Sequence, residues 1–92
     1  MDPDNAILQM KAFLKTLYED VELRGSGRGK FVVLNKGLKG AVISVGEDDK
    51  SWFVELWSEG DPTTGEENLI DERTIKLRED AIRRVCNWLD GN

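Results

Sequence analysis

The chain has 92 residues, and its 39% hydrophobic and 34% charged residues are typical of a globular protein rather than a disordered one. We expect a single domain over residues 1–92, because two separate cores would each be too small to offset the entropy of the chain. The net charge of -5 opposes general attraction to phosphate backbones and to anionic lipid surfaces.

Residues 1–5 lack the basic and apolar regions of a signal peptide, and no apolar run approaches the roughly 20 residues of a membrane span. The single cysteine, Cys86, has no partner for an internal disulfide. These features predict a cytoplasmic protein that is neither exported nor inserted in a membrane.

The chain begins with a helical pattern. Asp2 or Asp4 can cap the helix, and Pro3 suits its first turn. Apolar residues then recur at spacings of three and four, which predicts a helix from about Pro3 to Glu19 with one face on the core. The stripe comprises Ile7, Met10, Leu14, Leu17 and Val21, widened by Leu8 and Phe13.

From residue 21 onward the apolar pattern changes to that of strands separated by short polar turns. Four strands are expected, at Val21 to Arg24, Lys30 to Asn35, Gly40 to Val45 and Ser51 to Ser58. After the acidic loop Glu59 to Asn68, Leu69-Ile70 either opens a short fifth strand or pins the loop to the core, and Thr74 to Leu77 is equally ambiguous.

The final segment, Arg78 to Leu89, has one apolar and one polar face and predicts a second helix, which Gly91 ends. The order of helix, four or five antiparallel strands and helix indicates an α+β fold with both helices packed on one face of the sheet.

Several kinds of chemistry lack the residues that they require. The chain has no histidine, which removes the usual activation of a serine or cysteine nucleophile and most zinc and iron sites. The glycine-rich stretch 25–30 fails the phosphate-loop pattern at Arg24 and Phe31, and loop 59–68 does not match a calcium-binding loop. We therefore expect no enzyme activity, no cofactor and no metal site.

The strand at residues 51–58 offers a candidate binding surface. If Trp52, Val54 and Leu56 face the helices, Phe53, Glu55 and Trp57 must face the other way. In an open sheet they would form an amphipathic patch of the kind found at protein interfaces, whereas a curled sheet or an overlying loop would bury them. The surface expected to bind a partner is Phe53, Glu55, Trp57, Glu59 and Asp61.

A basic β-hairpin at residues 24–39 offers an alternative surface, because this segment contains five bases and no acid. The bases are Arg24, Arg28, Lys30, Lys36 and Lys39. Basic strands with interleaved aromatic residues can bind single-stranded nucleic acid, although the net charge of the chain opposes such binding.

The strand Ser51 to Trp57, the acidic loop after it and the closing helix Glu79 to Leu89 together resemble small one-domain immunity proteins of bacterial toxin systems. Those proteins are often acidic and inhibit a toxin by covering its surface, so the resemblance implies a basic protein partner. The basic strands at Lys30 to Asn35 and Lys39 to Ile43 resemble, in turn, the nucleic-acid-binding sheets of transcriptional coactivators.

The sequence thus predicts a non-enzymatic protein-binding module, with an immunity-type inhibitor of a basic protein as its most concrete form. Single-stranded nucleic-acid binding through residues 24–39 is the alternative. Homodimerisation through an open sheet edge or the aromatic face is compatible with either function.

Overall fold

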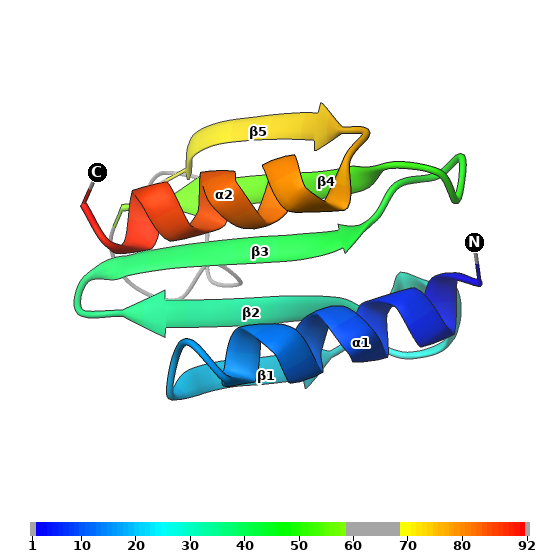
Figure 1. Cartoon of the computed structure of the whole chain (residues 1–92), viewed down its shortest axis with the longest axis horizontal. Coiled ribbons are helices and arrows are strands. Elements are labelled where there is room, and N and C mark those ends of the chain that lie inside the picture. Colours follow the sequence, from blue (N-terminus) through cyan, green and yellow to red (C-terminus); the bar gives the residue numbers. More distant parts are fainter. Residues whose placement is uncertain (1, 59–68, 92) are drawn as a thin grey trace.

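The fold was analysed in a computed structural model, which describes residues 2–58 and 69–91, apart from the side chain of Arg28. Two α-helices, a short 3-10 helix and five strands follow one another along the chain (Figure 1). Their bounds are α1 Pro3–Lys15, β1 Asp20–Arg24, η1 Gly27–Gly29, β2 Phe31–Lys36, β3 Lys39–Val45, β4 Trp52–Trp57, β5 Leu69–Ile75 and α2 Arg78–Leu89.

The five strands form one antiparallel sheet in the order β1-β2-β3-β4-β5, so each strand pairs with its neighbour in sequence. Both α-helices lie on the same face, with α1 over β1 and β2 and α2 over β3 and β4 (Figure 1). The expected α+β architecture is confirmed. The ambiguous segment after residue 68 is one continuous strand, β5, which pairs with β4 through an irregularity at Leu56 and Trp57.

Helix α1 begins as expected, because the Asp2 side chain accepts a hydrogen bond from the Asp4 N–H at 3.1 Å. The helix ends at Lys15, however, and not near Glu19. The N–H groups of Leu17 and Tyr18 both bond to the Leu14 carbonyl, which closes the last turn and lets the chain reverse into β1. Leu17, expected in the core stripe, is 50% exposed as a result.

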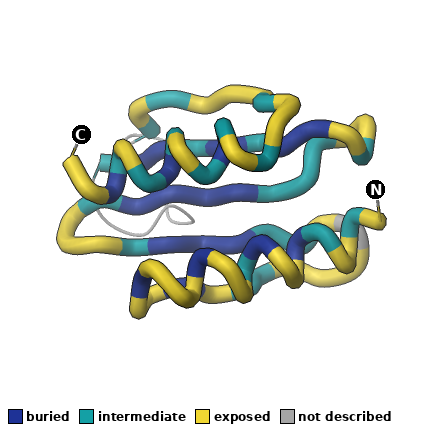
Figure 2. Tube along the Cα trace, viewed as in Figure 1, coloured by how far each residue is buried: buried dark blue, intermediate teal, exposed yellow. Residues whose placement is uncertain are grey.

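The main core lies between the helices and the inward-facing side chains of the sheet, where the buried parts of the chain in Figure 2 concentrate. On β4 these inward side chains are Trp52, Val54 and Leu56, which the alternating pattern of that strand predicted. The helices contribute Ile7, Met10, Leu14, Ala81, Val85 and Leu89 to the same cluster.

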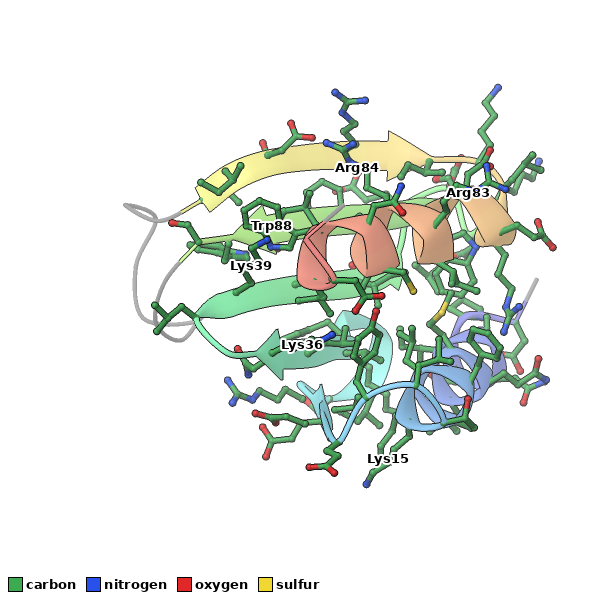
Figure 3. The ribbon with its side chains drawn as sticks, turned by 60° about the vertical axis from the view of Figure 1, so that its left-hand side comes forward. Lys15, Lys36, Lys39, Arg83, Arg84 and Trp88 are labelled. Carbon is green, nitrogen blue, oxygen red and sulfur yellow. The ribbon has the colours of Figure 1, made fainter. Side chains whose placement is uncertain are left out.

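Contacts with two strands, β3 and β4, fasten the end of α2 to the sheet. The Trp88 indole N–H donates to the Gly40 carbonyl at 3.0 Å and to the Trp57 carbonyl at 3.2 Å. Lys39 Nζ lies 4.7 Å from the centre of the Trp88 ring and donates to the Trp88 carbonyl at 3.1 Å (Figure 3). Because helix C-terminal carbonyls lack partners within the helix, this lysine supplies a cap from across the fold.

Asp90 links the same end of α2 to the rest of the chain. Lys36 Nζ lies 2.7 Å from one carboxylate oxygen and the Tyr18 hydroxyl donates to the other at 3.2 Å. The hydrogen bond from Lys36 lowers the pKa of Asp90, while burial raises the pKa of Tyr18. We call Tyr18, Lys36, Lys39, Trp88 and Asp90 the C-terminal clasp.

Replacing Trp88 with phenylalanine should lower the free energy of unfolding by about 1–2 kcal/mol, because two strand carbonyls lose their indole donor. Urea denaturation followed by circular dichroism measures this change. Asn87→Ala, at an exposed neighbouring position, is the control and should change stability by less than about 0.5 kcal/mol. Equal losses for the two variants would contradict the clasp.

Candidate functional site

Neither helix covers the second face of the sheet, which we call the outer face. Cross-strand pairing places one residue from each strand in a central row across this face. The central row consists of Glu22, Val33, Val42, Glu55 and Glu72. Three of its five members are therefore carboxylates, and Glu55 lies directly opposite Glu72.

A second row crosses the outer face next to the central one and brings two phenylalanines near each other. It consists of Arg24, Phe31, Ser44, Phe53 and Thr74. Phe31 and Phe53 are both half-buried, and the small side chain of Ser44 lies between them. We call this the aromatic row.

The outer face is acidic, whereas the helices are not. Its described acids are Asp20, Glu22, Glu55 and Glu72, and its one described base, Arg24, is paired with Glu22 at 2.8 Å. Each helix, by contrast, contains one more base than acid. The described part of the outer face thus carries more negative charge than either helix, which favours a cation on that face.

Trp57 lies on the outer face but is only 5% exposed, so the expectation that it forms part of an exposed patch is wrong. It packs with Val33 and Val42 in a second, smaller core, against which Phe31 and Leu69 lie. Gly40 is the cross-strand partner of Trp57 on β3. The buried indole N–H has no hydrogen-bond partner within the described structure.

Of the remaining four residues of the expected surface, the structure describes two. Phe53 and Glu55 are half-buried on the outer face, in adjacent rows, as the alternation of β4 predicted. Glu59 and Asp61 lie outside the described residues.

The turn from β3 to β4 is held by one carboxylate. Asp48 Oδ1 accepts hydrogen bonds from the Lys50 N–H at 3.0 Å, the Ser51 N–H at 3.1 Å and the Ser51 hydroxyl at 2.8 Å. These bonds, led by that from Lys50, lower the pKa of Asp48. Gly46 is required here, because a Cβ atom at this position would lie 2.4 Å from Ser51 Oγ.

This turn and the aromatic row border an open pocket of about 540 Å³. Its lining residues are Ser44, Val45, Gly46, Glu47, Asp48, Ser51, Phe53 and Thr74. Phe53 supplies an aromatic wall and Glu47 and Asp48 supply carboxylates. The sequence pattern predicts only a polar turn at residues 47–50. The pocket is not visible in it, because strand pairing brings Ser44 and Thr74 to this turn. We call this the turn pocket.

The five bases of the alternative surface are not gathered in one place. Lys30 precedes β2 and lies 3.6 Å from Asp4, whereas Lys36 ends β2 and belongs to the C-terminal clasp with Lys39. The six residues of β2 separate these two ends by roughly 20 Å. Arg24 pairs with Glu22 on the outer face, and the side chain of Arg28 is not described.

Within the described part of the chain, no group of three or more acidic or cysteine side chains is placed to hold a metal ion. None of the described helices is both long and apolar enough to cross a membrane.

Comparison with known proteins found no matching family, no matching curated protein and no matching solved structure.

The lowered pKa of Asp48 predicts how the turn responds to acid. A carboxylate whose pKa falls on folding stabilises the fold above its unfolded value of about 4, and this contribution is lost as the pH falls through the folded pKa. Asp48→Asn, which keeps the acceptor but removes the charge, should therefore be less stable than the wild type at pH 7 and approach it in acid. Urea midpoints between pH 7 and pH 2 measure the difference, and a constant difference would contradict the assignment.

Proposed function

We propose that this chain is a non-enzymatic protein-binding module that docks a basic partner protein on its outer face. An immunity-type inhibitor, which covers the surface of a basic target, is the most concrete form of this function. The observation that carries the proposal is the acidic central row lying directly beside the aromatic row on the face that neither helix covers.

The pairing of Glu55 with Glu72 concentrates negative charge on this face. The two glutamates hold directly opposite positions on β4 and β5, and Glu22 lies in the same row on β1. A row of carboxylates attracts cationic groups, which supports a basic partner.

Charge and aromatic area have separate roles in this proposal. The acids of the outer face would speed the encounter with a basic protein, and the half-buried rings of Phe31 and Phe53 would prolong the bound state. The strands are about 20 Å long and the sheet is about 19 Å wide, so the outer face spans at most roughly 400 Å². Val33, Val42 and Trp57 on this face are buried in the second core, which reduces the area that a partner can reach. A stable interface needs roughly 800 Å² on each partner, so the partner must also contact the turns at the strand ends.

The proposal places the protein in the cytoplasm, where its single free cysteine, Cys86, would remain reduced. The outer face could bind a partner in a monomer. It could equally do so in a homodimer that leaves this face free.

The test compares two double variants as baits for proteins of the source cell at physiological salt. Phe53→Ala/Glu72→Lys removes one ring and reverses one charge on the outer face. Leu8→Ala/Glu79→Lys makes the same kinds of change on the helix side, since Leu8 is 47% exposed and Glu79 is exposed. Circular dichroism confirms that both variants are folded.

We expect the wild type and the helix-side variant to recover the same basic protein, and the outer-face variant to recover at least about tenfold less. Equal recovery by all three baits, or recovery of an acidic partner, would overturn the proposal.

Single-stranded nucleic-acid binding through Arg24, Arg28, Lys30, Lys36 and Lys39 has weaker support, because Lys30 lies at the opposite end of β2 from Lys36 and Lys39. Titration with a single-stranded oligonucleotide at low salt should show no saturable binding. Binding that weakens steeply with added salt would favour this alternative.

A further inference from the structure

We propose that the turn pocket receives an arginine side chain of the partner. This inference rests on the proposed function and names the chemical group that the outer face recognises. The pocket lies where the turn from β3 to β4 meets three residues of the aromatic row, Ser44, Phe53 and Thr74.

The size and lining of the pocket suit one long side chain and part of its backbone. A volume of about 540 Å³ falls within the range of roughly 300–1,000 Å³ that is typical of small ligand sites. Its walls combine the Phe53 ring with the hydroxyls of Ser44 and Thr74, so they offer both an apolar surface and hydrogen-bond acceptors.

The charge of the lining is wholly negative. Glu47 and Asp48 are its two ionisable residues, and Lys50, the one base of the turn, does not line it. The hydrogen bonds from Lys50 and Ser51 all end on Asp48 Oδ1, so Oδ2 has no bond to these residues and can accept one from a ligand. A cation is therefore the complementary ligand.

Arginine fits this combination better than lysine. Its planar guanidinium stacks on an aromatic ring and presents five donors, while an ammonium is a compact and more strongly hydrated charge. Here Phe53 supplies the ring, Asp48 and Glu47 the charged acceptors, and Ser44 and Thr74 the neutral acceptors.

The pocket is built before a ligand arrives. Ser51 is only 3% exposed, and the Gly46 N–H donates to its carbonyl at 2.8 Å, which ties the two ends of the turn together. A rigid turn loses little conformational entropy on binding, so even an isolated side chain should bind measurably.

The experiment titrates the full chain with Nα-acetyl-arginine amide and follows backbone amides by NMR. Nα-acetyl-citrulline amide, a neutral analogue of nearly the same shape, is the matched ligand control. We expect saturable shifts centred on residues 44–53 and 74 with the arginine compound, and affinity at least about tenfold lower for citrulline.

Variants locate the binding group. Asp48→Asn should weaken arginine binding about tenfold and Glu47→Gln about threefold, while Glu79→Gln on α2 should leave it unchanged. Equal binding of citrulline, absence of saturable shifts near the turn, or loss on Glu79→Gln alone would overturn the inference. Because no partner protein is used, such a failure would leave the partner-docking experiment to be judged separately.

Discussion

The one-sided packing of the two helices is the constraint on which the rest of the structure depends. The apolar face of the sheet is buried under the two helices. The inward residues of β4, which are Trp52, Val54 and Leu56, lie on the side of α2, and those of β1 and β2 lie on the side of α1. Strand alternation then presents every intervening side chain on the other face. The composition of the outer face is thus a direct consequence of how the main core is built. Val33, Val42 and Trp57 form a second core on this face, and Phe53, Glu55 and Glu72 remain at least partly exposed.

The two ends of the sheet differ in what lies against them. At one end the C-terminal clasp joins α2 to β3 and β4 through Trp88 and Lys39, and on the reverse side Trp57 lies buried opposite Gly40. At the other end the turn stabilised by Asp48 leaves a pocket open beside Phe53. The two ends are thus fixed by different contacts, those of Trp88 and Lys39 at the first and the hydrogen bonds of Asp48 at the second.

The candidate site was only partly predictable from the sequence. The alternation of β4 placed Phe53 and Glu55 on the outer face correctly, because period-two patterns are local. It could not show that Trp57 would be buried, because Trp57 packs with Val33 and Val42, which become its neighbours only through strand pairing. The turn pocket was missed for the same reason, because Thr74 reaches it from β5.

The sequence by itself determined the order and type of the two α-helices and the first four strands, the bounds of α2 and the assignment of faces on β4. All of these follow from spacings of two to four residues. Tertiary structure alone decided where α1 ends, that the segment after residue 68 forms β5, and that Lys30 and Lys36 lie at opposite ends of a strand. It also set the cross-strand register that assembles Glu22, Glu55 and Glu72 into one row. Register is a property of strand pairs and is selected by burial across the whole sheet, so no single segment encodes it.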